Sequence, residues 1–306
     1  MFLRRSKTGW IAETPAKINL FFEVLGRRSD NFHEIVSVAL PLRLFDTIAF
    51  DGTDDPQIQF ECIGGGEDVP LGETNIVVRA ARLIQQRFNV QRGVSIKLTK
   101  RIPSQAGLGG GSSDAAAAFR LACRVWHLEI PDSDLIPITA EIGSDCPIFF
   151  YDTPTISRGR GEQIQPLPSV SPLWFVLLKP SEGLSTAAVY AECMPLHDGR
   201  FRQPVDLLAV LSGGDVHAIG KNLFNRLEIP AQNLWHRFGE VKKQLLDSGC
   251  LAAQMSGSGT AFFGLCRDES HAEEIQRRLM VQNSRSSFSL QEKFCSLSSL
   301  REHPQP

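Results

Sequence analysis

The chain lacks several features that would place it in other classes of protein. None of its seven cysteines forms a CxxC pair, so a zinc site is not expected, and no GxxxxGK is followed by Ser or Thr, which excludes a Walker loop. The opening residues have no apolar core of signal-peptide length, and no run approaches the ~20 residues of a transmembrane span. We therefore expect a cytoplasmic protein with reduced thiols.

The net charge is also small. The 32 basic and 34 acidic residues leave a formal charge of -2, so neither a nucleic acid nor a membrane surface is expected as a partner. The 306 residues suffice for two domains with separate cores. The proline-rich stretch from Pro166 to Pro172 predicts a boundary that divides the chain into residues 1–165 and 166–306. Monomer and homodimer both stay open.

The most informative stretch is glycine-rich and lies between a predicted strand, with Val94, Ile96 and Leu98 alternating, and a predicted helix. Glycines allow backbone conformations that a β-carbon forbids, and the N–H groups at a helix start attract anions. The stretch predicts a phosphate site with Ser112 or Ser113 as helix N-cap, although a tight connection without a ligand is the competing interpretation. The predicted nucleotide-binding residues are Pro103, Ser104, Gln105, Ala106, Gly107, Leu108, Gly109, Gly110, Gly111, Ser112 and Ser113.

Five other residues occupy positions suited to chemistry. Lys17 and Asn19 share the polar face of a predicted half-buried strand. Phe32 and His33 end a turn-rich loop and suit a flat heterocycle, through stacking and hydrogen bonding. Asp145 lies between Gly-Ser and an apolar run, so it needs a partner or a role. Three ordinary structural explanations compete: Lys17 as a solvated lysine, Phe32 and His33 as a loop anchor, and Asp145 as a turn aspartate.

The remaining patterns predict the secondary structure around these residues. Asn75 stands at the head of a helix, where it is either the N-cap or a contact to a base. The second half is expected to form an antiparallel sheet with helices on one face. Its predicted strands are 173–178, 251–255, 261–266 and 288–290, and its predicted helices begin near 186, 205, 234 and 271. The tail from Ser298 is expected to be frayed.

Three motifs in order along the chain resemble the GHMP kinases, a superfamily of small-molecule kinases. They are Pro15-Ala16-Lys17-Ile18-Asn19-Leu20, the stretch from Pro103 to Ala116, and Met255-Ser256-Gly257-Ser258-Gly259-Thr260. The likeness extends from Pro15 to about Leu279. It implies an α+β protein with the two-domain GHMP kinase fold, in which the first domain is like ribosomal protein S5 domain 2 and the second is ferredoxin-like.

Within the superfamily the chain most resembles a branch that phosphorylates a cytidine-linked polyol in non-mevalonate isoprenoid biosynthesis. The segments that carry this likeness are the triple glycine with Ser112-Ser113-Asp114, residues 26–33, residues 143–150 and Asn225-Arg226-Leu227-Glu228. The resemblance implies transfer of a phosphoryl group from ATP, with Mg²⁺, to a hydroxyl of the acceptor. A GHMP kinase with another alcohol acceptor and a nucleotide-binding protein without catalysis are the alternatives.

The resemblance also implies roles for single residues. Asp145 falls on the catalytic aspartate, which accepts the proton of the attacking hydroxyl, and Lys17 falls on its partner lysine, which orients the reacting groups and neutralises charge. Phe32 and His33 fall where the family binds cytosine. Asn19 falls beside the polyol and Asn75 near the adenine. No acidic magnesium ligand can be aligned, so Ser112 or Ser113 is expected to reach a metal held mainly by phosphates and water.

Three positions depart from the family pattern. The chain has Asp30-Asn31-Phe32-His33 where the family usually has Asp-Gly-Tyr-His. Phenylalanine keeps the stacking face and asparagine tolerates a left-handed turn, so the loop is expected to keep its shape. Arg226 stands where aspartate is common, and the sequence does not predict the consequence.

Overall fold

The computed structural model describes residues 1–66, 69–193, 201–282 and 288–295. The chain forms two compact units, and each is built from segments that are far apart in the sequence. The first contains residues 1–16, 44–104 and 109–151, and the second contains residues 17–43, 105–108 and the described part of the chain from 152 onward. Compactness is a different criterion from family domains, so the boundary between residues 165 and 166 stays a prediction.

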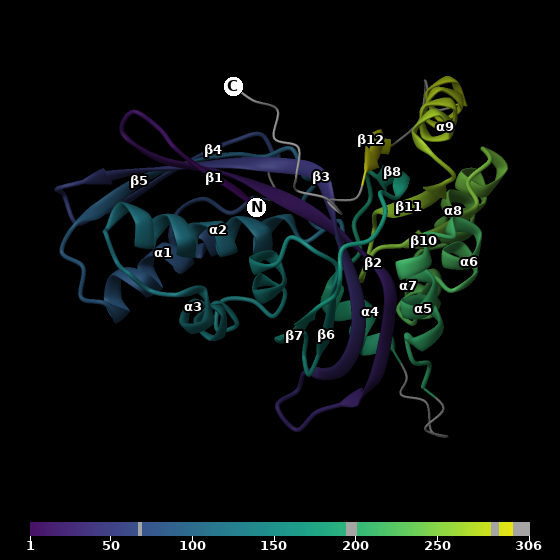
Figure 1. Ribbon diagram of the computed structural model, residues 1–306, viewed down its shortest axis with the longest axis horizontal. Coiled ribbons are helices and arrows are strands. Elements are labelled where there is room, and N and C mark those ends of the chain that lie inside the picture. The colour runs from purple at the N-terminus through teal and green to yellow at the C-terminus, as the bar shows by residue number, and fades with distance from the viewer. Residues whose placement is uncertain (67–68, 194–200, 283–287, 296–306) are drawn as a thin grey trace. The chain divides into compact units, whose positions relative to one another are not determined.

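The first unit is a sheet covered on one face by helices (Figure 1). Its strand order is β1-β2-β3-β5-β4, from β1 (Phe2–Arg5), the first part of β2 (Gly9–Arg27), the last part of β3 (His33–Thr53), β4 (Ile58–Ile63) and β5 (Gly93–Thr99). The helices are α1 (Ile76–Arg87), α2 (Gly110–Val125) and α3 (Asp132–Thr139). The predicted strand before the glycines is confirmed as β5, in which Val94, Ile96 and Leu98 are buried.

The second unit contains two groups of strands. The rest of β2 and β3 pair with β9 (Phe224–Asn225) and β6 (Thr155–Arg158), and β6 pairs with β7 (Gln163–Pro166). A separate antiparallel sheet has the order β10-β11-β8-β12, with β10 (Ala252–Met255), β11 (Phe262–Cys266), β8 (Trp174–Pro180) and β12 (Phe288–Cys295). This sheet confirms the strands predicted for the second half.

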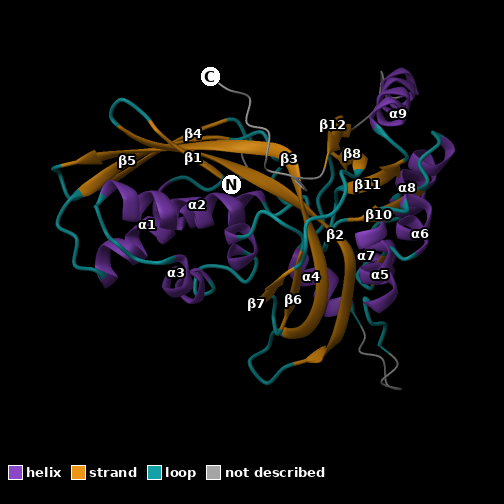
Figure 2. Ribbon diagram, viewed as in Figure 1, coloured by secondary structure: helices purple, strands orange, loops and turns teal. Residues whose placement is uncertain are grey.

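Helices pack against this antiparallel sheet (Figure 2). They are α6 (Val216–Lys221), α8 (Phe238–Asp247) and α9 (Glu269–Gln282), while α4 (Thr186–Glu192), α5 (Val205–Gly213) and α7 (Glu228–Leu234) complete the unit. The one helix predicted from residue 234 was wrong in extent, because the chain breaks after α7 and resumes as α8. The predicted tail from Ser298 lies outside the described residues.

The prediction that β2 is half-buried is wrong. Its residues from Thr14 to Val24 are buried on both faces, including Lys17, Asn19 and Glu23. Polar side chains are tolerated inside because each has hydrogen-bond partners there, such as Asn19 Nδ2, which donates to Ser37 Oγ at 2.7 Å. The polar side chains of β2 therefore lie inside the protein and not on its surface.

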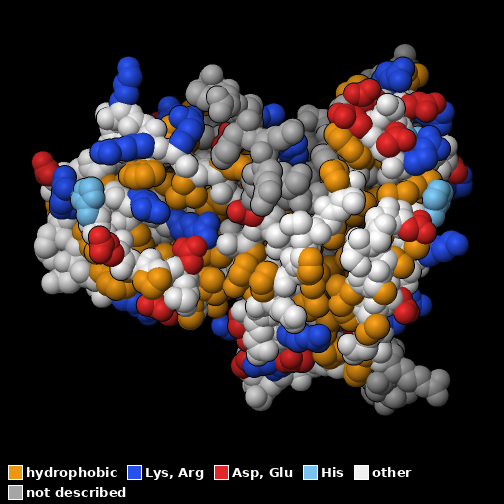
Figure 3. Space-filling view, viewed as in Figure 1, with side chains coloured by type: hydrophobic (Ala, Val, Ile, Leu, Met, Phe, Trp, Pro, Cys, Tyr) orange, Lys and Arg blue, Asp and Glu red, His pale blue; other side chains and the backbone are white. Residues whose placement is uncertain are grey.

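Two properties of the whole chain can be read from its described residues. None of the described helices is long and apolar enough to cross a membrane. Side chains of both charge signs occur over the face shown in Figure 3, in keeping with the small net charge of -2.

Candidate active site

The glycine-rich stretch leads into α2 through a left-handed residue. Gly109 has φ 71° and is the residue before the helix, which begins at Gly110. The prediction that Ser112 or Ser113 caps α2 is wrong, because both lie inside its first turn. Gly109 has no side chain with which to cap the first N–H groups, so these donors stay suited to an anion.

The two serines of this turn have different environments. Ser113 is fully buried, and its Oγ has no hydrogen-bond partner among the described residues. Ser112 is half-buried and hydrogen-bonds to the thiol of Cys146, whose pKa is raised to about 12 by burial. Of the two hydroxyls, that of Ser112 is therefore the one within reach of a ligand.

The contact between Ser112 and Cys146 brings the segment of Asp145 to the start of α2. A β-carbon on Gly143 would lie 3.9 Å from Ser112 Oγ, so the two segments are closely packed. Asp145 is half-buried and precedes the 3₁₀ helix Cys146–Phe150, but its side chain makes no capping hydrogen bond. The first unit thus combines a helix start suited to phosphate with a carboxylate in the neighbouring segment.

In the second unit, Lys17 contacts Gly107 and Leu108 of the glycine-rich stretch. Its Nζ donates to Asn19 Oδ1 at 2.6 Å and to the carbonyl of Gly107 at 3.0 Å. The backbone N–H of Lys17 also donates to the carbonyl of Leu108 at 2.8 Å. Since Lys17 is only 3% exposed, the interpretation as a solvated lysine is wrong.

The third motif contacts the same point of the chain. Ser256 Oγ donates to the carbonyl of Gly107 at 2.8 Å. A β-carbon on Gly107, which has φ +71°, would lie 2.0 Å from the carbonyl oxygen of Ser256, and one on Gly257 would lie 3.5 Å from Lys17 Nζ. The three sequence motifs therefore meet around Gly107, where only glycine fits.

Asn75 is an N-cap, one of the two alternatives that the sequence left open. Its Oδ1 accepts from the N–H of Val77 at 2.8 Å, and its Nδ2 donates to the carbonyl of Pro70 at 2.7 Å. Both polar atoms of the side chain are thus engaged in holding the start of α1. The contact of Asn75 with adenine stays a prediction.

The loop that carries Phe32 and His33 has the predicted turn. Asn31 has φ 67°, which confirms that asparagine supplies the left-handed conformation expected of it. The ring of Phe32 is 47% exposed, and the guanidinium of Arg160 lies 4.9 Å from its centroid. His33 is half-buried at the start of β3, where burial and then the charge of Arg27 lower its pKa.

Sequence reasoning missed the aromatic partner of His33. The ring of Tyr190, on α4, lies 5.0 Å from that of His33 with an interplanar angle of 35°. A helix was predicted there, but nothing in its pattern singled out the tyrosine. The one available signal was rarity, since the chain has only two tyrosines.

The departure at Arg226 also has a structural partner that the sequence did not indicate. Arg226 Nε and Nη2 donate to the two carboxylate oxygens of Glu23, at 2.7 and 2.9 Å. Glu23 is fully buried and also accepts from the N–H groups of Val24 and Arg202, both at 3.0 Å. An arginine at this position therefore neutralises a carboxylate inside β2.

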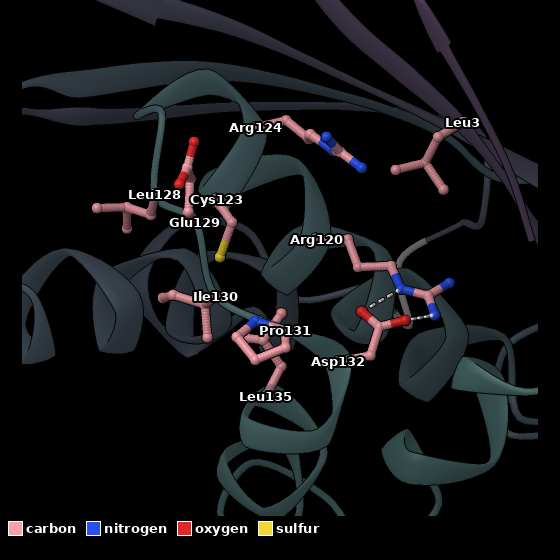
Figure 4. Close-up of a pocket in the computed structure, with 10 residues that line it drawn as sticks. All are labelled: Leu3, Arg120, Cys123, Arg124, Leu128, Glu129, Ile130, Pro131, Asp132 and Leu135. Atoms are coloured by element: carbon pink, nitrogen blue, oxygen red, sulfur yellow. Dashed lines mark hydrogen bonds and ion pairs between the residues drawn. The ribbon is translucent and has the colours of Figure 1, made fainter.

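The first unit also contains a pocket (Figure 4). It has a volume of ≈ 580 Å³, and its lining includes Leu3, Arg120, Asp132 and Leu135. Its arginine and aspartate bond to each other, with Arg120 Nη2 donating to Asp132 Oδ2 at 2.5 Å. None of the predicted site residues lines it, so we do not assign it to the reaction.

Comparison with known proteins identifies the class. The family model of the GHMP kinases N terminal domain matches residues 75–153, and that of the GHMP kinases C terminal matches residues 206–283. The chain therefore belongs to the GHMP kinase family. The predicted resemblance and the two-domain GHMP kinase fold are confirmed.

The chain is also similar to particular members of the family. A relative from Shouchella clausii named 4-diphosphocytidyl-2-C-methyl-D-erythritol kinase is 38% identical over 267 residues, covering 87% of this chain and 89% of the relative. A crystal structure of 4-(cytidine 5'-diphospho)-2C-methyl-D-erythritol kinase is 31% identical, with a TM-score of 0.77, and covers 94% of this chain and 98% of that one.

A mevalonate kinase from L. major, solved in complex with R-mevalonate, shares the fold. Its TM-score is 0.75 at 15% identity, covering 97% of this chain and 99% of that one. At that identity the likeness shows the fold alone, so it does not bear on the acceptor.

Proposed function

We propose that the protein transfers the γ-phosphoryl group of ATP to the 2-hydroxyl of 4-diphosphocytidyl-2-C-methyl-D-erythritol, in isoprenoid precursor biosynthesis. The observation that carries the proposal is the meeting of the three motifs around Gly107, with the ammonium of Lys17 bonded to its carbonyl. The choice of acceptor is supported by relatives that carry the name of this kinase at 36–38% identity.

ATP would bind on the glycine-rich stretch, with its phosphates at the N–H groups that begin α2 and its adenine near Asn75. The helix start has the uncapped donors and the positive end of the dipole that a phosphate requires. Gly109 and Gly107, both with positive φ, shape the backbone in this stretch. The burial of Ser113 favours Ser112 as the serine that faces the phosphates.

The same residues fit Mg²⁺ as a companion of ATP. Among the described residues there is no group of three His, Cys, Asp or Glu side chains that could hold a metal ion. Mg²⁺ bound to a nucleotide needs only one or two protein oxygens besides phosphates and water. Ser112 would supply one, and the bound ion would neutralise charge on the phosphates.

Asp145 would accept the proton of the acceptor hydroxyl while the hydroxyl oxygen bonds to the γ-phosphorus and ADP leaves. Lys17 would orient the hydroxyl and offset the negative charge that gathers around the transferred group. Such a reaction depends mainly on positioning and charge stabilisation. The hydrogen bonds from Lys17 Nζ to Asn19 and Gly107 suit that role.

The cytosine of the acceptor would bind at Phe32, His33 and Tyr190. Phe32 presents an exposed ring, and Tyr190 presents a second aromatic face beside His33. A neutral histidine has one donor and one acceptor nitrogen, which suits the edge of a base. Asn19, bonded to Lys17, would face the polyol part.

A phosphotransfer assay with a panel of acceptors tests the proposal. ADP release is measured with ATP and Mg²⁺ in the presence of the cytidine-linked substrate, mevalonate, homoserine or galactose. We expect turnover with the cytidine-linked substrate alone. Turnover with another alcohol would replace the acceptor, and ATP binding without turnover of any of them would indicate a non-catalytic nucleotide-binding protein.

Substitution of Phe32 tests the cytosine contact separately. Phe32→Ala should raise the KM of the acceptor at least tenfold, in keeping with the roughly 1–3 kcal/mol of a base stacked on an aromatic ring. Phe32→Tyr keeps the ring and serves as the matched control. An equal rise in the KM of ATP would remove Phe32 from the acceptor site.

Two further expectations belong with this proposal. The cytoplasm is the compartment that suits the six described cysteines, all of which are free thiols. Either a monomer or a homodimer is compatible with a small-molecule kinase.

A further inference from the structure

Three charged residues form a buried cluster in the first unit, outside the predicted site. The side chains of Lys100, Asp46 and Asp114 are 5%, 0% and 1% exposed. Lys100 Nζ donates to Asp114 Oδ2 at 2.8 Å and also to Asp46 Oδ2. Burial of charged groups is costly even when they are paired, so hydrophobic residues could often replace such a cluster without loss of stability. Stability alone therefore does not account for the cluster.

The cluster joins the two ends of the glycine-rich stretch. Asp46 Oδ1 accepts from the backbone N–H groups of Arg101 at 2.5 Å and Ile102 at 2.8 Å, directly before Pro103. Asp114 follows Ser113 near the start of α2, and its Oδ1 accepts from Thr14 Oγ1 at 2.6 Å. Lys100 bonds to both carboxylates, so one ammonium links the entry of the stretch to its exit.

The glycine pattern itself makes room for this link. A β-carbon on Gly110 would lie 3.1 Å from Lys100 Nζ and 2.8 Å from Ile102 Cγ2. Gly110 has an ordinary helical conformation rather than a positive φ, so close approach is what requires glycine there. Burial alone would lower the pKa of Lys100, but the charges of Asp114 and Asp46 raise it, and the linking ammonium stays charged.

We propose that Lys100, Asp46 and Asp114 are positioning residues, which hold the two ends of the glycine-rich stretch at a fixed separation so that its N–H groups are already arranged for the phosphates of ATP. The proposal rests on the stretch being the ATP site. A loop whose ends are fixed loses less conformational freedom on binding, and this favours affinity. None of the three side chains is assigned a contact with ATP.

The test compares a variant of the cluster with a stability control on α2, the helix that carries Asp114. Lys100→Met removes the ammonium and keeps most of the stem, whereas Leu121→Ala opens a cavity farther along α2, where Leu121 is fully buried. Both are assayed well below their melting temperatures. For Lys100→Met we expect the Kd and KM of ATP to rise at least tenfold, with the KM of the acceptor changed less than twofold. For Leu121→Ala we expect both ATP constants within twofold of wild type.

Hydrogen exchange supplies a readout without catalysis. In the absence of ATP, amides of residues 104–113 should exchange at least tenfold faster in Lys100→Met than in Leu121→Ala. Equal exchange and equal Kd in the two variants would make the cluster structural only and overturn the proposal.

A second variant and a binding measurement without acceptor complete the test. If Lys100→Met does not fold, Asp114→Asn takes its place, because it leaves the pair of Lys100 and Asp46 intact, and an unchanged Kd of ATP in that variant would overturn the proposal. The Kd of ATP is measured by calorimetry without acceptor. Failure of the acceptor panel would thus reject the proposed function while the test of the cluster still stands.

Discussion

Lys17 shows how a single side chain is held in place by glycines elsewhere. Its Nζ reaches the carbonyl of Gly107, and a side chain on Gly257 would come within 3.5 Å of that nitrogen. A β-carbon at Gly107 would clash with the carbonyl of Ser256 at 2.0 Å, and the φ of +55° at Gly257 disfavours any other residue there. The position of the Lys17 ammonium thus depends on the absence of side chains at Gly107 and Gly257.

Asp145 is the residue on which the proposed chemistry depends most. Asp145→Asn keeps the shape and removes the proton acceptor, so we expect kcat to fall at least ~10²-fold, as is typical when a general base is lost. Because asparagine has the same shape as aspartate, the fold should be retained. The measurement is a coupled ADP assay with thermal unfolding of the same sample. Near wild-type turnover would remove Asp145 from the mechanism.

His33 predicts a pH dependence of acceptor binding. Burial and the charge of Arg27 lower its pKa below the usual 6.5, so the ring is neutral at pH 7. As the pH falls below 6.5, protonation removes the acceptor nitrogen, and the KM of the acceptor should rise while that of ATP stays flat. KM is measured for both substrates from pH 5 to 8, with His33→Gln as control. A wild-type profile identical to that of His33→Gln would contradict the assignment.

The same shift has a consequence for stability with a definite sign. The folded pKa of His33 lies below that of the unfolded chain, so on acidification the unfolded state binds the proton first. The contribution is therefore present above pH 6.5 and is lost as the pH falls through the folded pKa. His33→Gln should lack this part of the acid destabilisation.

Among the elements, those with local patterns could be predicted from the sequence. The alternation in β5, the helical face of α2 and the strands of the antiparallel sheet depend only on near neighbours in the chain, and all were predicted. The start of α2 was misplaced, because helix propensity does not reveal that Gly109 adopts φ 71°.

Features that depend on distant partners could not be predicted. The burial of Lys17 follows from contact with Gly107, 90 residues away, and that of Glu23 from Arg226, 203 residues away. Lys100 stands next to Arg101 in the sequence, a pair that is typical of a solvated turn. Its two carboxylate partners come from β3 and α2, and no local pattern indicates them.

Directly after β9, Arg226 forms an ion pair with Glu23 of β2 that should matter for stability. Arg226→Met would leave Glu23 buried without its guanidinium, and such losses cost about 3–5 kcal/mol. Lys243→Met is the control, because Lys243 and Asp247 are exposed and their pair should contribute under about 0.5 kcal/mol. Urea unfolding of both variants measures the difference. Equal midpoints would show that backbone donors alone satisfy Glu23.

At the scale of the whole molecule, the proposed acceptor residues share one compact unit. Lys17, Asn19, Phe32 and His33 come early in the sequence, yet they group with the third motif and with Tyr190 in the second unit. The first unit holds α1, α2 and Asp145. Of the stretch that would bind ATP, residues 105–108 belong to the second unit and the flanking residues to the first.

This division predicts that the two ligands stabilise the protein independently. Cytidine diphosphate and ATP should each raise the melting temperature, since a ligand at 100 times its Kd adds about 2.7 kcal/mol, which corresponds to a shift of roughly 5 °C for a protein of this size. A tenfold weaker ligand at the same concentration adds only about 1.4 kcal/mol, so Phe32→Ala should at least halve the shift with cytidine diphosphate and keep that with ATP, whereas Lys100→Met should do the reverse. Thermal unfolding with each ligand alone measures both shifts. If either variant loses both shifts together, the two ligands do not bind at the separate sets of residues assigned to them.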